Sequence, residues 1–368
     1  MPVTFAAARR DGRNYESKAR TAFVTERSSA RWTEAGRTET KSGIIRYKCS
    51  LRLVTPAIVA GFDQTRAELR WAAIRGNVRR FHRLIDPGMA MESRIFGGTT
   101  KETGQSLWLL RSREATLTSE DASKLTGPKY FTWPLSERGH FRPHGDTTLP
   151  ITFDIIFRPE AEESDRRRVR DAFRLWSLWG GLGARTRRGF GSVSLEMVGP
   201  PGEPTIPAMP ADVDGWLAAA AGELGSLATQ YGITWRHRWL IGPPVRSWED
   251  ALQGVAASMA AFRGDRNRPE DGTAPETVRF GLPVKLGIGT FTGEKHDRSA
   301  SSVWIRVIRL GNRYCASVVY MPTPFLPPGE RVGGPNKTVW DVPAEDALTK
   351  FMDELATPRG WQEVVAHG

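Results

Sequence analysis

The sequence predicts an α+β protein with two tandem domains, each built on an antiparallel sheet, preceded by a basic N-terminal arm. Three observations support this prediction. Strand-like alternation and helix-like spacing follow one another through residues 44–199, a proline-rich segment interrupts the chain at 200–210, and similar patterns return in 211–368. A chain of 368 residues is long enough for two such domains.

The pattern in residues 44–199 follows a known order of elements. In IIRYKCSLRLV, which begins this segment, apolar and polar residues alternate as in a half-buried strand. The expected elements are strand 44–54, helix 74–85, strands 107–110 and 151–157, a helix capped by Ser164 or Asp165 and ended by Gly180-Gly181, and strand 191–198. The order strand, helix, strand, strand, helix, strand predicts a ferredoxin-like (RRM-like) domain.

The second domain is expected to begin after PPGEPTIPAMP (200–210), whose five prolines continue neither a helix nor a strand. The expected elements beyond it are helices near 216–227 and 251–262, strands at 281–288, 303–310 and 314–321, and a helix near 344–355. We interpret residues 211–368 as a second, degenerate ferredoxin-like domain, and residues 1–43, which are polar, arginine-rich and aperiodic, as the arm.

The charge predicts a polyanionic partner. The formal net charge is +11, and it is concentrated: residues 1–48 carry a net +6 and residues 166–188 a net +7. A basic membrane face would require a helix with a free apolar stripe, whereas the stripe here is expected to face a core, so no membrane partner is expected. Cys49 and Cys315 form no CxxC pair, and no secretory signal is recognisable, which indicates a reducing, cytoplasmic location.

The segment GGLGARTRRGFG (180–191) is the sharpest local feature. Glycines allow a backbone to approach a ligand closely, exposed N–H groups cradle phosphates, and arginine forks bind phosphate oxygens. The alternative is a flexible turn with solvated arginines. The segment follows a helix and precedes a strand, unlike a dinucleotide fingerprint, and the sequence contains no GxxxxGK[ST] motif.

Several motifs together resemble one protein family. GGLGARTRRGFGSV resembles the glycine-rich loop of the RAMP superfamily of CRISPR proteins. LRLVTPAIVAG, ELRWAAIRGNVRRFHR, ESRIFGG, FGLPVKLGIG and DRSASSVWIRVIRLGNRYCASVVYMPTPFLP follow in the order of one branch of that superfamily. That branch is similar to the first-numbered RAMP subunit of the Cmr module, the type III-B effector that targets RNA. The resemblance covers about residues 44–328.

The resemblance implies a non-catalytic subunit without cofactors that holds the 3′ part of the guide crRNA and helps to capture target RNA. Its implied partners are these RNAs and the other RAMP and small subunits of the Cmr effector. The IRGxxR motif of this branch corresponds to Ile74–Arg79, and its two arginines lie four residues apart on one helix face. The candidate RNA-binding residues of the helix and the loop are Arg75, Arg79, Arg80, Gly181, Gly183, Arg185, Arg187 and Arg188.

The connection KLTGPKYFTWPLSERGHFRPH (124–144) adds two further candidates. Its aromatic residues alternate with cations such as Lys129 and Arg142, a composition that suits base stacking combined with phosphate contacts. A hydrophobic plug or an interface with another subunit accounts for the same composition. His140 and His144 have a metal-ligand spacing, but Pro143 breaks any helix between them, so no metal site is expected.

Two other classes of function remain open on the sequence. In a metal-dependent endoribonuclease, Asp63 would hold a divalent ion near the scissile phosphate. In a separate catalytic alternative, His82 would act as a general base for RNA cleavage. A scaffold subunit would contact only protein. We therefore expect an RNA-binding, non-catalytic protein, with the ribonuclease and the scaffold as alternatives.

Overall fold

The computed structural model describes most of the chain after the arm. The described residues are 44–59, 67–98, 104–114, 119–120, 125–136, 144–145, 150–264, 266–344, 346–357 and 360–365. Asp63, Arg142, His140 and the predicted arm (1–43) lie outside them. All described residues belong to one compact unit, Ser42–Gly368.

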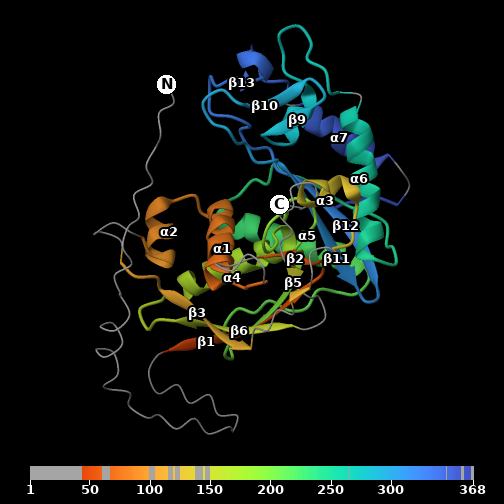
Figure 1. Ribbon diagram of the computed structural model, residues 1–368. Coiled ribbons are helices and arrows are strands. Elements are labelled where there is room, and N and C mark those ends of the chain that lie inside the picture. The colour runs from red at the N-terminus through yellow and green to blue at the C-terminus, as the bar shows by residue number, and fades with distance from the viewer. Residues whose placement is uncertain are drawn as a thin grey trace, which may run out of the picture. The chain divides into compact units, whose positions relative to one another are not determined.

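A four-stranded antiparallel sheet with two helices forms the first half of this unit (Figure 1). Its elements are β1 (Ile45–Leu53), α1 (Trp71–Ile85), β3 (Trp108–Glu114), β6 (Ile151–Phe157), α4 (Glu163–Trp179) and β7 (Val193–Val198). The strand order is β3-β6-β1-β7, and each neighbouring pair is antiparallel. This order is that of a ferredoxin-like domain and confirms the predicted fold class.

The alternation in β1 places its apolar side chains under the helices. Tyr47, Cys49 and Leu51 are buried, whereas Lys48 and Arg52 are exposed on the opposite face of the sheet. The predicted N-cap of α4 is wrong by two to three residues. Glu162 caps this helix, and its backbone N–H donates to Asp165 Oδ2 at 3.0 Å in a capping box, because carboxylates at both positions satisfy the free N–H groups.

Several short elements connect these strands and helices. They are β2 (Ala57–Ile58), α2 (Met89–Phe96), β4 (Ser119–Glu120), α3 (Lys129–Ser136) and β5 (His144–Gly145). The strands among them form a small sheet of order β2-β5-β4. Neither α2 nor α3 was predicted: each spans eight residues, too few for a clear helical period.

A second ferredoxin-like arrangement follows. Its elements are α5 (Val213–Tyr231), β8 (Arg238–Ile241), α6 (Trp248–Gly264), β11 (Val303–Leu310), β12 (Arg313–Tyr320), α7 (Asp346–Ala356) and β15 (Gln362–Glu363). The antiparallel order β11-β12-β8-β15 repeats that of the first sheet, with α5 as an additional helix before it. The predicted degenerate copy is thus present, although its first and last strands were not predicted.

The predicted strand at 281–288 is wrong, because a hairpin turn interrupts it. Within this range only Val284–Leu286 form a strand, β9. The chain then turns and returns as β10 (Gly289–Gly293), which pairs antiparallel with β9. These strands belong to a separate small sheet of order β14-β13-β10-β9 with its own apolar core. The remaining elements there are β13 (Val332–Gly333), β14 (Val339–Trp340) and the 3-10 helices η2 (Glu276–Phe280) and η3 (Pro335–Lys337).

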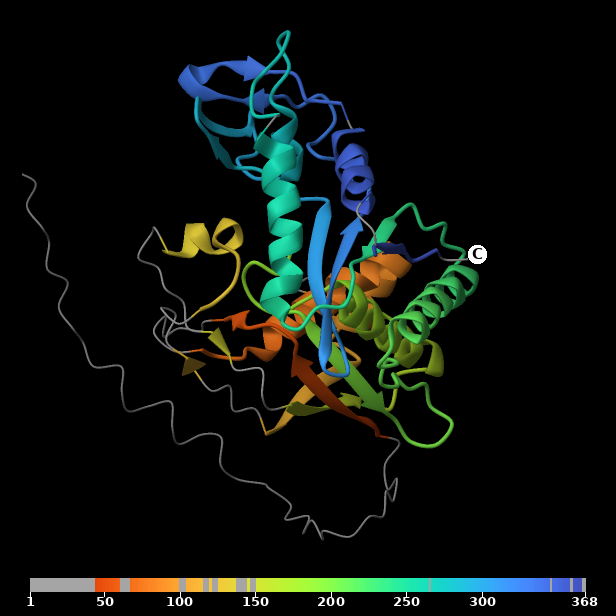
Figure 2. The same ribbon diagram turned by 90° about the vertical axis from the view of Figure 1, so that its right-hand side faces the viewer.

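Strands β11 and β12 of the second sheet are buried over most of their length on both faces. Ile305 and its alternate neighbours on β11 pack in a core with α6 and α7, whereas Trp304 and Ile308 pack in the core that contains α1 and α4. Figure 2 shows β11 and β12, in blue, beside α6. Such strands are apolar on both faces, which explains the nearly continuous apolar run VWIRVIRL. The predicted boundaries at 199 and 211 stay a prediction; Ile206 between them is buried and pairs with Met197.

Candidate nucleic-acid interface

The glycine-rich loop folds tightly onto the protein. Its Gly183 and Gly191 have φ angles of +90° and +64°, and a Cβ atom on Gly191 would lie 1.9 Å from the carbonyl oxygen of Leu182. The N–H groups of Leu182, Ala184 and Gly191 donate, each at 2.8 Å, to the carbonyl oxygens of Gly191, Ile58 and Pro56. These glycines therefore allow backbone to pack against backbone, and these three N–H groups are engaged within the protein rather than exposed to a phosphate.

Two arginines of this loop face the second half of the chain. Arg187 donates to the Ser301 carbonyl oxygen, and its guanidinium lies 5.3 Å from the centroid of the Trp304 ring. Arg188 donates to the Phe280 carbonyl oxygen at 3.0 Å. The backbone N–H of Ile305 also donates to the Arg187 carbonyl oxygen, at 3.3 Å, which joins the loop to the edge strand β11.

Burial and the proximity of other arginines make the charged forms of Arg187 and Arg188 energetically unfavourable. Burial, together with the neighbouring Arg80 and Arg188, lowers the pKa of Arg187 to about 9. Burial and the nearby Arg263 lower the pKa of Arg188 to about 10. Both side chains bind carbonyl oxygens but no carboxylate among the described residues. A bound anion would offset this unfavourable crowding of positive charge.

The loop forms one wall of a large basic cleft of about 1120 Å³. The other walls come from the start of α3, the end of α6, and residues 280–287 and 298–301. Seven cationic side chains and no acidic ones line the described part of this cleft: Lys129, Arg185, Arg187, Arg188, Arg263, Lys285 and Arg298. We call this set the basic cleft. Its volume and charge suit an extended polyanion.

The basic cleft unites predicted and unpredicted residues. Lys129 and the three loop arginines were candidates from the sequence. Arg263, Lys285 and Arg298 were missed, because they lie 75 or more residues further along the chain and carry no local motif. Arg263 also donates to the Tyr130 hydroxyl at 2.7 Å, which attaches the aromatic start of α3 to the end of α6.

Gly181, which was predicted to contact RNA, lies inside the protein. It is buried, and its carbonyl oxygen accepts a hydrogen bond from Trp176 Nε1 at 3.1 Å. Gly183 is exposed beside the cleft residues of the loop. The RNA contacts predicted for both glycines stay predictions.

The arginines of α1 lie in two different surroundings. Arg79 donates to Glu92 Oε1 at 2.5 Å, and Arg75 donates to the Phe96 carbonyl oxygen, so both approach α2. Arg80 is exposed and stacks on Trp304, 4.9 Å from the ring centroid, which places it near Arg187. The predicted pairing of Arg75 and Arg79 on one helix face is confirmed as geometry; their contact with phosphates stays a prediction.

His82 lies in the core of the first half. Its ring is fully buried, 5.2 Å from the ring of Phe96, and neither ring nitrogen has a hydrogen-bond partner among the described residues. Burial lowers its pKa, so the imidazole is neutral near pH 7. An RNA strand at the surface does not reach a side chain in this position.

Glu92 holds the arginines of α1 against α2 and should make stability depend on pH. It is buried, and hydrogen bonds from Arg83 and Arg79 lower its pKa to about 2 from an unfolded value of 4.5. The stabilisation is therefore complete above about pH 4.5 and is lost as the pH falls toward 2. We expect Glu92→Gln to cost about 2 kcal/mol at neutral pH, since Arg83 is half exposed and screened.

Urea unfolding of both proteins between about pH 7 and pH 3 would measure this contribution. The difference in unfolding free energy between wild type and Glu92→Gln should shrink below about pH 4.5. A difference that stays constant over this range would contradict the assignment.

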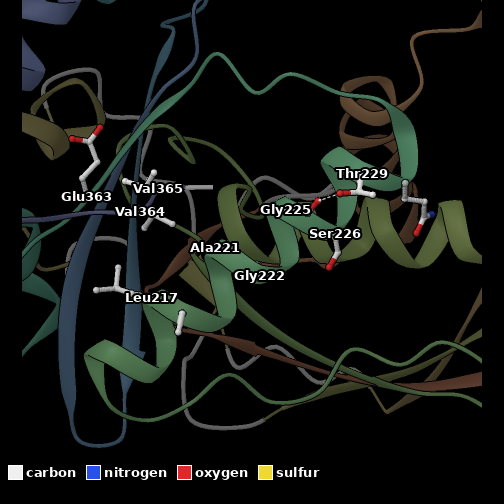
Figure 3. Close-up of a pocket in the computed structure, with 11 residues that line it drawn as sticks. Leu217, Ala221, Gly222, Gly225, Ser226, Thr229, Glu363, Val364 and Val365 are labelled. Atoms are coloured by element: carbon white, nitrogen blue, oxygen red, sulfur yellow. Dashed lines mark hydrogen bonds between the residues drawn. The ribbon is translucent and has the colours of Figure 1, made fainter. Parts of the chain in front are cut away.

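A second large cavity, of about 1010 Å³, lies along α5 and β15 (Figure 3). Small and apolar side chains such as Leu217, Ala221 and Val364 line it, with Glu363 as its charged residue. The absence of cations among the described residues that line it makes it unsuited to a polyanion. Within the described ranges, no group of three or more His, Cys, Asp or Glu side chains is placed to hold a metal ion. No helix in the described part of the chain is both long and apolar enough to cross a membrane.

Comparison with known proteins agrees with this fold. A family model described as the RAMP superfamily matches residues 50–194. The crystal structure of Cmr1 from Pyrococcus furiosus (apo form) is similar, with a TM-score of 0.56 and 13% sequence identity over 87% of this chain and 98% of that chain. A chain in the cryo-EM structure of the type III-B Cmr-beta bound to cognate target RNA has a TM-score of 0.48 and 10% identity over 85% of this chain and 99% of its own. No curated protein matches the sequence.

Proposed function

We propose, from the match of residues 50–194 to the RAMP-superfamily model, that the protein is a non-catalytic, RNA-binding RAMP subunit of a type III-B CRISPR effector. It would hold the 3′ part of the guide crRNA and help to capture target RNA beside other RAMP and small subunits. The order of motifs in the sequence and the fold similarity to Cmr1 support this assignment.

The basic cleft is the observation that carries the proposal. Seven cations without an acidic neighbour among the described lining residues, next to the family's glycine-rich loop, favour the phosphates of a nucleic acid. Contacts of this kind are largely independent of sequence, as a subunit that accepts different guides requires. The burial of His82 supports a binding role rather than general-base catalysis by that residue.

The best test removes cations that do not hold the fold together. The side chains of Lys129, Lys285 and Arg298 are exposed and make no hydrogen bond or ion pair within the described residues. We expect the triple alanine variant to keep its stability within about 0.5 kcal/mol. The slope of log K against log salt for binding single-stranded RNA should fall by about 2, at about 0.7 for each lost phosphate contact. Fluorescence anisotropy at several salt concentrations would measure it.

The matched control removes three cations from the open face of the first sheet, which is where many RRM-like domains bind RNA. Lys48, Arg52 and Arg111 are exposed there and form no ion pair with a described residue. Their triple alanine variant should bind RNA with an unchanged salt slope. If instead this control loses the slope and the cleft variant does not, the cleft is not the RNA site.

Denaturing gels of the same protein–RNA mixtures with Mg²⁺ or Mn²⁺ test the proposal that the protein does not cleave RNA. The RNA should stay intact. Cleavage that EDTA abolishes and that Asp63→Ala reduces would overturn it in favour of a metal-dependent endoribonuclease. Binding of partner subunits that survives nuclease treatment and both triple substitutions, together with no binding of RNA by the wild type, would favour a scaffold that contacts only protein.

A further inference from the structure

We propose that the RNA-binding surface continues from the basic cleft across α1 to a second anion site that holds a phosphate of the same single-stranded RNA. The inference rests on the proposed function and extends it by naming a further site and its ligand. The site is a hollow of about 470 Å³ between α1, the end of α2 and the start of β3. We call it the α1 hollow; it is lined by Arg75, Arg79, Phe96–Gly98, Gly104–Leu109 (except Leu107) and Arg158.

The charge of the α1 hollow is positive and only partly compensated. Three arginines line it, and no acidic residue does among those described. Arg79 is paired with the buried Glu92, whereas Arg75 donates to a carbonyl oxygen and Arg158 to the amide oxygen of Gln105. Burial, together with Arg79, lowers the pKa of Arg75. Two guanidinium groups thus lack a carboxylate among the described residues, which favours an anionic ligand.

Trp108 and Ser106 add an aromatic ring and a hydroxyl to the lining of the α1 hollow. Trp108, which lines the hollow, is 1% exposed, and its indole N–H has no acceptor among the described residues. Arg75 lies over the same ring, 5.5 Å from its centroid.

Arg80 connects the two sites. Its guanidinium and that of Arg187, a member of the basic cleft, stack on the same Trp304 ring at 4.9 and 5.3 Å. The residue before it in α1 is Arg79, which lines the hollow. Arg80 is exposed and has no carboxylate partner in the described part of the chain. The proposed path for the RNA therefore runs from Arg187 to Arg80 and then across α1 to the hollow.

The test compares short and long RNA on the full-length protein. An oligouridylate of about 6 nucleotides should occupy only the basic cleft, whereas one of about 20 should also reach the hollow. We expect Arg75→Ala/Arg158→Ala to lower the salt slope for the long RNA by about 1.4 and to leave that for the short RNA unchanged. Arg75→Lys/Arg158→Lys, which keeps both charges, should restore most of the long-RNA slope.

The outcomes separate this inference from the proposed function. If neither RNA responds to the hollow variant while both respond to the cleft variant, the continuation is wrong and the cleft assignment stands. Loss of short-RNA binding in the hollow variant would also overturn it, because the hollow would then be the primary site. If the cleft variant leaves both RNAs unaffected, the basic cleft is not the RNA site, and the assignment on which this inference rests fails.

A gain-of-binding variant covers the case in which the double variant does not fold. Glu92→Gln removes the carboxylate that neutralises Arg79 and Arg83 beside the hollow. Once circular dichroism has verified that it is folded at low temperature, it should bind the long RNA several-fold more tightly and the short RNA as before. Equal affinity of wild type and variant for the long RNA would contradict the proposal.

Discussion

Replacing Arg306 by alanine is expected to cost the protein about 4 kcal/mol of unfolding free energy. Arg306 extends from β11 into the core shared with α4 and is 1% exposed. It donates to the carbonyl oxygen of Ser177 near the end of α4 and, at 2.5 Å, to that of Val193 at the start of β7. Its removal leaves two buried acceptors without a donor and a cavity between the two sheets.

Two further variants separate these effects. Arg306→Met fills much of the cavity but donates no hydrogen bond, so about half of the loss should remain. Arg309→Ala, on the same strand but exposed, should change stability by less than about 0.5 kcal/mol. Urea unfolding measures all three. An Arg306→Ala protein as stable as Arg309→Ala would show that this contact does not hold the two halves together.

The second large effect is expected at Gly191. An alanine there would place its Cβ 1.9 Å from the Leu182 carbonyl oxygen at a φ of +64°. The backbone must then separate, which breaks the hydrogen bonds of Gly191 with Leu182 and Pro56. We expect Gly191→Ala to cost about 3 kcal/mol or more. Displacement of Arg187 and Arg188 should at the same time weaken RNA binding.

Gly202→Ala is the matched control for this variant. Its φ is also positive, at +85°, but no atom lies within 4 Å of the position that its Cβ would take. This substitution should lower the unfolding free energy by only about 1 kcal/mol, because alanine disfavours the left-handed conformation, and it should leave RNA binding unchanged. Thermal unfolding and anisotropy titrations check both variants. A Gly191→Ala protein that behaves like Gly202→Ala would mean that the loop has room to open without loss.

Whether an element could be predicted from the sequence depended on its length and on how it is buried. The strands 151–157 and 303–310 were predicted with the bounds that they have, because a mostly apolar run of this length is typical of a buried strand. The strand β8 was missed since RWLI is only four residues long, and β15 since it has two exposed residues. Both are strands because they pair with a neighbour, a property that no local pattern carries.

The candidate site shows the same division. The glycine-rich loop and the IRGxxR helix are continuous segments, so their residues were identified from sequence motifs alone. Arg263, Lys285 and Arg298 join the basic cleft only because the chain returns past the loop after α6 and again before β11. Packing also decided that several loop N–H groups bind the protein's own carbonyl oxygens.

The sequence by itself determined that the protein is α+β, basic and similar to RAMP proteins, because periodicity, net charge and motif order are properties of the linear chain. The tertiary structure alone decided which cations share one cleft and which, like Arg79, are neutralised by a buried carboxylate. It also decided that Arg306 connects β11 with α4 and β7 through the carbonyl oxygens of Ser177 and Val193. Such distinctions depend on distances between segments far apart in sequence, which only packing sets.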